Sequence, residues 1–167
     1  TSPYVGAGSF TAAAGLQNYS VTDDNGCTVD TSFTITEPSA LKAMVVANSI
    51  LCHGDSTTLI VSAIGGSSPY TGTNTITVAA GTYTQTVVDN NGCIDDTIIT
   101  ITQPNALQIA ISAGSISCNG GTASVVVSAN GGTTPYNGDG AFITTAGTST
   151  YMVMDDNGCA AQDSITL

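Results

Sequence analysis

Residues 81–93 read GTYTQTVVDNNGC, a run of alternating Thr, Tyr, Gln and Val that ends in an Asn-Gly pair and a cysteine. Side chains that alternate along the chain are typical of a half-buried β-strand, and β-branched residues favour the extended backbone. Asn91-Gly92 predicts a hairpin with a type I′ turn, because both central residues of that turn need positive φ. The stretch therefore predicts two antiparallel strands joined by a tight turn.

The same turn recurs at a fixed interval. Cys27, Cys93 and Cys159 lie 66 positions apart, and each follows an Asn-Gly pair. Self-similarity at a fixed interval of this length indicates tandem structural units. A Pro-Tyr pair repeats with the same spacing, at Pro3-Tyr4, Pro69-Tyr70 and Pro135-Tyr136. We expect a partial repeat 1 at 1–39, a complete repeat 2 at 40–105 and a nearly complete repeat 3 at 106–167.

Within repeat 2 the pattern is strand and turn throughout. The expected strands are residues 41–47, 57–63, 74–78, 82–88 and 97–102. Short strands with regular turn signals are typical of a β-sandwich. The predicted fold is all-β, with tandem immunoglobulin-like β-sandwich repeats of about 66 residues forming an elongated rod. Because the sequence starts inside a predicted repeat, we expect it to be a piece of a longer repetitive protein.

Composition excludes several classes of function. Charged residues make up 8% of the chain, the net charge is −11, and Lys42 is its only Lys or Arg. Binding to nucleic acid needs clustered cations, so a nucleic-acid partner is excluded. No apolar stretch reaches the length of a membrane span, so membrane insertion is not expected. The single histidine, His53, has no repeated counterpart, and the acidic residues recur instead of converging, so we expect no enzyme activity.

Several short motifs in fixed order resemble the SprB-type repeat of giant cell-surface adhesins in gliding Bacteroidota. They are Gly131-Gly132-Thr133-Thr134-Pro135-Tyr136, Ala80-Gly81-Thr82-Tyr83, Asp89-Asn90-Asn91-Gly92-Cys93 and Ile99-Thr100-Ile101-Thr102-Gln103-Pro104. The resemblance covers essentially the whole chain, although the Trp often found in that repeat is missing. It implies a secreted protein of the cell surface, exported by the type IX route, that takes part in adhesion or gliding motility.

We therefore expect a structural and adhesive segment of a large extracellular filament, acting as a stiff spacer. Its partners would be neighbouring repeats of the same chain, other copies in a fibre, and external surfaces or glycans. Two alternatives stay open. One is a glycan- or ligand-binding β-module, although all three Phe residues fall on expected core faces. The other is a subunit of a self-assembling fibre of several chains.

The five cysteines lack the spacing of a metal site, and this indicates disulfides formed in an oxidising compartment. One pairing stays within each repeat, with Cys52–Cys93 and Cys118–Cys159. In an immunoglobulin-like topology, however, Cys52 and Cys93 fall at opposite poles, too far apart to bond. The favoured pairing is then Cys52–Cys159 across the joint between repeats, with Cys27 and Cys118 paired outside this sequence.

Two further kinds of site are candidates. The turn carboxylates could bind Ca²⁺, which prefers oxygen ligands, although Asp in a turn also caps local N–H groups. No cofactor other than calcium is expected. The calcium candidates are Asp23, Asp24, Asp89, Asp155 and Asp156. Asp-Ser/Thr-X sequences resemble the O-glycosylation motif of Bacteroidota and mark Ser56, Thr97 and Ser164 as acceptors.

Overall fold

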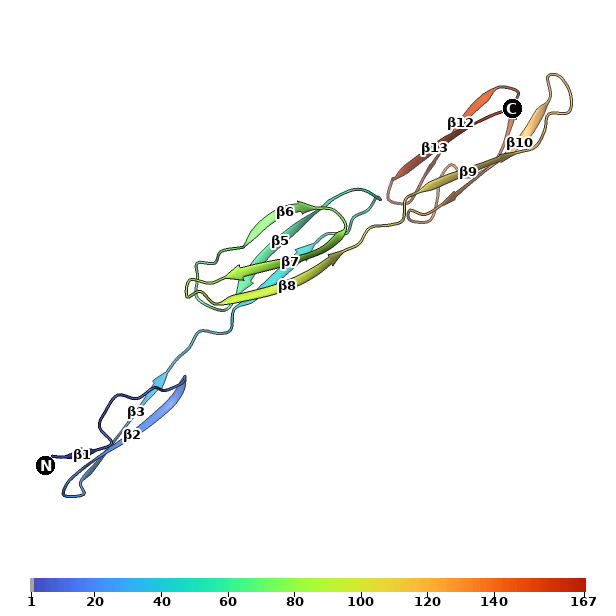
Figure 1. Cartoon of the computed structure of the whole chain (residues 1–167). Coiled ribbons are helices and arrows are strands. Elements are labelled where there is room, and N and C mark those ends of the chain that lie inside the picture. The colour runs from blue at the N-terminus through green and yellow to red at the C-terminus, as the bar shows by residue number, and fades with distance from the viewer. Residues whose placement is uncertain (1) are drawn as a thin grey trace.

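A computed structural model describes residues 2–167, and every regular element in that range is a β-strand. All strand pairs are antiparallel. The strands form three successive bodies that lie end to end as an elongated molecule (Figure 1). We name them the N-terminal body (residues 2–35), the middle body (42–101) and the C-terminal body (108–166). The all-β prediction is confirmed.

The middle body packs two sheets face to face. One sheet has the order β4-β5-β6 and the other pairs β7 with β8. Leu59 comes from one sheet and Val87 from the other. Both are fully buried and belong to the same apolar cluster. The five strands agree with the ranges expected from the sequence, except that the last begins earlier. Their bounds are β4 (Lys42–Ala47), β5 (Thr57–Ile64), β6 (Asn74–Val78), β7 (Gly81–Val88) and β8 (Ile94–Ile101).

The C-terminal body repeats this arrangement, with one sheet of order β11-β10-β9 and a second of β12 and β13. Its core is smaller and is formed by Val125, Val127 and Val153. Val125 and Val153 stand 66 positions after Leu59 and Val87, and both are fully buried. The strands are β9 (Gln108–Ala113), β10 (Thr122–Asn130), β11 (Gly140–Thr145), β12 (Thr148–Met154) and β13 (Ala160–Thr166).

The chain crosses between the two sheets of the middle body more than once. After β5 it passes to the other sheet, where Thr71 forms a bridge with Val88 on the free edge of β7. It then returns to pair β6 with β5, and crosses again into β7. Asn137 and Met154 form the same bridge in the C-terminal body.

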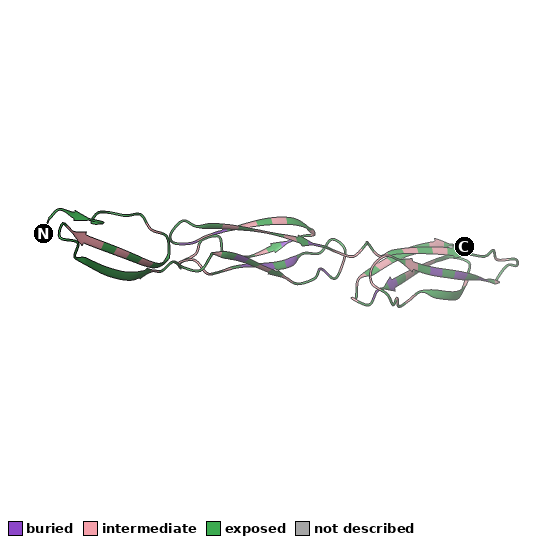
Figure 2. Ribbon diagram, turned by 90° about the horizontal axis from the view of Figure 1, so that it is seen from below, coloured by how far each residue is buried: buried purple, intermediate pink, exposed green. Residues whose placement is uncertain are grey.

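The N-terminal body has one sheet only, of order β1-β2-β3. Its strands are β1 (Tyr4–Val5), β2 (Gly15–Asp23) and β3 (Thr28–Ile35). No residue between 2 and 39 is fully buried, as the burial colours of Figure 2 show. Phe10 and Phe33 were expected on core faces but are 59% and 50% exposed, because no second sheet covers this side of the N-terminal body.

The turn after β7 differs from the predicted type I′. No residue other than Gly has positive φ among residues 2–167, so Asn91 cannot occupy that turn's first central position. Instead, the amide of Gly92 donates to the carbonyl of Asp89 and the amide of Asp89 to that of Cys93, with positive φ only at Gly92. This is a three-residue loop whose last residue is left-handed. The Asp89 carboxylate stabilises it by accepting from the amides of Asn91 and Cys93.

Candidate functional site at the joint between two bodies

The middle and C-terminal bodies are joined by a disulfide between Cys52 and Cys159, whose Cα atoms lie 5.6 Å apart. Cys52 lies in the loop between β4 and β5, and Cys159 follows the turn after β12. This is the pairing across the joint that the topological argument favoured. The bonds within each repeat, Cys52–Cys93 and Cys118–Cys159, are absent; Cys93 and Cys118 are free and exposed.

The course of the strands explains why Cys52 does not bond to Cys93. β5 starts just after Cys52, and β6 runs antiparallel to β5. β7 follows β6 after a two-residue link and so runs in the same direction as β5. Cys93 therefore lies past the far end of β7, a full strand length from Cys52. An eight-residue strand spans about 26 Å, far beyond the reach of a disulfide.

A hydrogen bond reinforces the disulfide on the same side of the joint. The side-chain amide of Asn157 donates to the carbonyl of Leu51 at 3.3 Å and to the hydroxyl of Thr133 at 2.9 Å. The loop of the middle body is thus bound to the turn of the C-terminal body by a covalent bond and a polar contact. Leu51 is next to Cys52 in the chain and Asn157 is two positions before Cys159, so their hydrogen bond restricts rotation about the disulfide.

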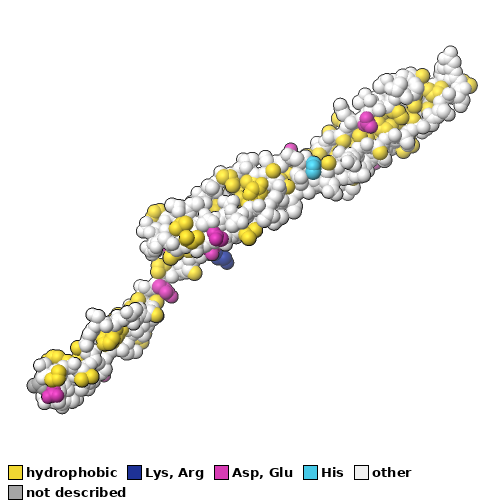
Figure 3. Space-filling model, in the orientation of Figure 1, with side chains coloured by type: hydrophobic (Ala, Val, Ile, Leu, Met, Phe, Trp, Pro, Cys, Tyr) yellow, Lys and Arg dark blue, Asp and Glu magenta, His cyan; other side chains and the backbone are white. Residues whose placement is uncertain are grey.

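The same loop also braces the linker that connects the two bodies. Nδ1 of His53 lies 3.0 Å from the carbonyl oxygen of Pro104, and the amide of Gly54 donates to Oε1 of Gln103 at 2.8 Å. Pro104 has a fixed φ, which further limits bending at this point. His53 is visible at the junction in Figure 3. Its role in the structure is a contact to the linker, and among residues 2–167 no cysteine or serine side chain is hydrogen-bonded to it.

A hollow of about 320 Å³ lies beside the disulfide, lined by residues from both bodies. His53 and Asp55 contribute its polar side chains from the middle body, and Leu107 its largest apolar side chain from the linker side. The face of the rod shown in Figure 3 carries few charges anywhere.

Two buried aspartates shape the turns at the poles of the bodies. Oδ2 of Asp155 accepts from the amide of Thr133 and Oδ1 from those of Asn157 and Cys159. Burial alone would raise the pKa of Asp155, but these N–H donors outweigh it and hold the pKa below its ordinary value. At Asp89, the amide of Ser67 is the main cause of a lowered pKa, which burial opposes and the amides of Cys93 and Asn91 reinforce.

These contacts bear on the calcium candidates. The carboxylates of Asp89 and Asp155 already accept three backbone N–H groups each. Asp23 accepts from Asn25 and Cys27 in the same way. Within residues 2–167, no three His, Cys, Asp or Glu side chains come together in a group that could hold a metal ion. Calcium binding at Asp23, Asp24, Asp89, Asp155 or Asp156 stays a prediction.

The expected glycosylation sites have different surroundings. Ser56 and Ser164 are exposed, whereas Thr97 is half-buried on the inner face of β8. The hydroxyls of Ser56 and Ser164 are thus accessible to a transferase, and that of Thr97 is much less so. Modification of all three stays a prediction.

Sequence reasoning missed part of the cysteine arrangement. If Cys159 bonds to the preceding body, then Cys93, its counterpart 66 positions earlier, also lacks a partner here, as do Cys27 and Cys118. The repeat register alone could have shown this. The contact of His53 with the linker had no such signal, because Asn119 stands at the corresponding position.

Comparison with known proteins gives no matching family model, and no curated protein matches the chain. Among the residues that the structure describes, none form a helix long and apolar enough to cross a membrane. A disulfide is typical of proteins from oxidising compartments.

Proposed function

We propose that this chain is a stiff spacer: a stretch of tandem immunoglobulin-like repeats in an extracellular filament, whose job is to hold one body at a set distance from the next. The observation that carries the proposal is the joint. There the Cys52–Cys159 disulfide, the Asn157–Leu51 hydrogen bond and the His53–Pro104 contact act together on a short linker. Three restraints around one linker are what a spacer needs and what a flexible tether lacks.

Two features support the repeat architecture within this proposal. Motifs 66 positions apart fall on corresponding strands of the middle and C-terminal bodies, as Leu59 and Val125 do. The double crossing between sheets, through Thr71 and then β6, is the kind of connection found in immunoglobulin-like sandwiches. Each body would then add one domain length to the rod.

The proposal extends to the location and the biological role. The disulfide fits an extracellular protein, and the motif resemblance to SprB-type repeats suggests the surface of a gliding bacterium, with adhesion or motility as the process served. A net charge of −11 would also keep neighbouring filaments apart by repulsion.

Solution scattering on the chain and on Cys159→Ser tests the spacer. We expect the wild type to give the maximum dimension of a straight rod, and the variant to give a broader distribution with shorter mean extension. Cys93→Ser is the matched control, because that cysteine is exposed and unbonded. Equal flexibility of the wild type and Cys159→Ser would contradict the proposal.

A further inference from the structure

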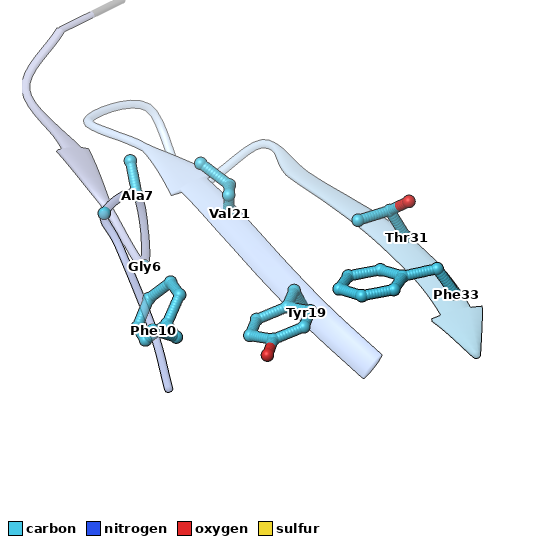
Figure 4. A pocket seen from close by; sticks show the side chains of 8 residues that line it. Gly6, Ala7, Phe10, Tyr19, Val21, Thr31 and Phe33 are labelled. Atoms are coloured by element: carbon cyan, nitrogen blue, oxygen red, sulfur yellow. The ribbon is translucent and has the colours of Figure 1, made fainter. Parts of the chain in front are cut away.

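The N-terminal body exposes an apolar face on its single sheet. Tyr19 on β2 stacks on Phe33 of β3 with ring centroids 5.6 Å apart, and Phe10 lies 5.2 Å from Tyr19 on the other side. Together with Val21 they line an open hollow of about 350 Å³ (Figure 4). An apolar surface of this kind on a small body is unusual unless something covers it.

The corresponding face is covered in both of the other bodies. Val87 and Val153 stand 66 and 132 positions after Val21, and both have 0% exposure, whereas Val21 is partly exposed. In the middle body the cover is the β4–β5 hairpin, which places Leu59 and Val61 against the β7–β8 sheet. The side chains on the β2–β3 face are therefore those of a sandwich interior, but no second sheet covers them.

A free thiol points to the same missing element. Cys93 is exposed and unpaired, and its counterpart Cys159 bonds to a cysteine in the hairpin loop of the body before it. That hairpin, β4–β5, is the one that covers the β7–β8 face. By the same geometry, a partner for Cys93 would come from the loop of a hairpin that covers the β2–β3 face. The open face and the free thiol thus specify one occupant independently.

We propose that the β2–β3 face is the docking site of a β-hairpin of the β4–β5 type, with small aliphatic side chains on its inner face and a loop cysteine that bonds to Cys93. A glycan could also stack on the rings of Phe10 and Phe33, but it would leave the thiol unexplained. The inference rests on the repeat register of the proposed function, and not on the rigidity of the joint.

The covalent step is an ordinary thiol–disulfide exchange. The thiolate of one cysteine attacks a low-molecular-weight disulfide such as oxidised glutathione and releases one glutathione thiol. The second cysteine then attacks the mixed disulfide and releases another. The two protein thiols lose two protons and two electrons, and the glutathione disulfide takes them up as two thiols. Docking of the hairpin would select Cys93 by holding its loop cysteine nearby.

The test uses an extended chain in which residues 40–67 are placed directly before Ser2, so that Ser2-Pro3 follows as Ser68-Pro69 follows in the middle body. Refolding is carried out in a glutathione redox buffer. The chain has free thiols at Cys27, Cys93 and Cys118, and the extension adds one more. We expect alkylation and peptide mapping to find the added cysteine bonded to Cys93, with only Cys27 and Cys118 still reactive.

Two substitutions separate docking from chance oxidation. Phe33→Asp in the extended chain should abolish the selective bond, because it places a charge in the covered face. Leu16→Asp should leave it intact, because Leu16 lies on the face of β2 opposite Tyr19 and Val21 and would stay uncovered after docking. If the extended chain does not refold, a synthetic peptide of residues 40–67 added to the unmodified chain gives the same readout.

Three results would overturn the proposal. One is oxidation spread evenly over Cys27, Cys93 and Cys118. A second is a bond to Cys93 that Phe33→Asp does not affect. The third is an extended chain whose Phe10 and Phe33 remain open to oxidative footprinting and bind an oligosaccharide. None of these results would change the stiffness of the rod measured by scattering. The docking proposal and the spacer proposal can therefore fail separately.

Discussion

Cys52 and Cys159 are 107 positions apart in the chain, yet their Cα atoms lie 5.6 Å apart across the joint between two bodies. The bond does not staple a single core. It closes a loop that contains most of both cores, with Leu59 and Val87 in one and Val125 and Val153 in the other. The bond therefore holds the two bodies together, in addition to stabilising the fold of each one.

Cys159→Ser should lower the stability of the linked pair and uncouple its two bodies. In the chain-entropy treatment, closing a loop of about 100 residues removes about 4.7 kcal/mol of unfolded-state freedom. We expect that value to be the upper limit of the loss in unfolding free energy when the two bodies unfold together. Calorimetry should show one broadened or split transition in the variant, because each body then unfolds by itself. Cys93→Ser should leave the thermogram unchanged, and splitting in both variants would argue against the role of the disulfide.

Leu59→Ala should destabilise the middle body strongly. Leu59 is fully buried between the two sheets, and removing a buried leucine side chain typically costs about 2–5 kcal/mol. Ile60 is the next residue on the same strand but faces outward and is 49% exposed, so Ile60→Ala should cost no more than about 0.5 kcal/mol. Chemical denaturation measures both. A similar loss from each would mean that the burial difference across β5 does not control stability.

The strands of this protein could be predicted from the sequence because their signals are local. Alternation places Leu59 and Val61 on one face of β5, and that face is buried in the structure. The type of the turn at Asn91-Gly92 could not be predicted in the same way. It depends on the Asp89 carboxylate, which also binds the amide of Ser67, 22 positions away. The contact between Asp89 and Ser67 thus had more influence on the turn than the preference of Asn91-Gly92 for type I′.

The joint was partly predictable for a related reason. The topology brings Cys52 close to Cys159 and separates it from Cys93, and the order of the strands was enough to argue this. The contact of His53 with Pro104 depends on how the loop packs on the linker, and no residue pattern carries that information. The exposure of Phe33 was also unforeseen, because alternation shows which side of a strand is apolar and not whether a second sheet covers it.

Gly66→Ala should be more harmful than Gly92→Ala. Both glycines have positive φ, 58° and 82°, a conformation that costs other residues about 1–2 kcal/mol. At Gly92 an added Cβ meets open space, so that strain is the whole cost. At Gly66 the Cβ would lie 2.6 Å from Oδ2 of Asp89 and would disturb its hydrogen bond with Ser67. The melting temperature of Gly66→Ala should be well below that of Gly92→Ala. The reverse order would refute the steric argument.

Chelation should leave thermal stability unchanged. Three of the five candidate carboxylates, those of Asp23, Asp89 and Asp155, already accept backbone N–H groups, and a cation would have to displace these donors. We expect equal melting temperatures with EDTA and with millimolar Ca²⁺. A clear increase with Ca²⁺ that Mg²⁺ does not reproduce would instead establish a calcium site. Asp24→Ala and Asp156→Ala would then show whether the second carboxylate of each turn is a ligand.

Acid should destabilise the protein through its buried turn carboxylates. Asp155 has a pKa below its ordinary value of 3.8 in the folded protein, because the hydrogen bonds from Thr133, Cys159 and Asn157 outweigh burial. A lowered folded pKa means that the ionised form contributes stability above the unfolded pKa, and that this contribution is lost as the pH falls through the folded pKa. We expect the melting temperature to hold steady at neutral pH and to fall below about pH 4.

The matched pair Asp155→Asn and Asp156→Asn isolates this effect. Asp155→Asn keeps an acceptor oxygen but removes the charge, so it should lower the melting temperature at pH 7 and flatten its decline in acid. Asp156 is exposed on the same turn, and Asp156→Asn should follow the wild-type pH profile. Because Asp89 makes the same contacts in the middle body, Asp89→Asn should produce a second, additive flattening. If both Asp155→Asn and Asp89→Asn retain the full acid dependence, other carboxylates must cause it.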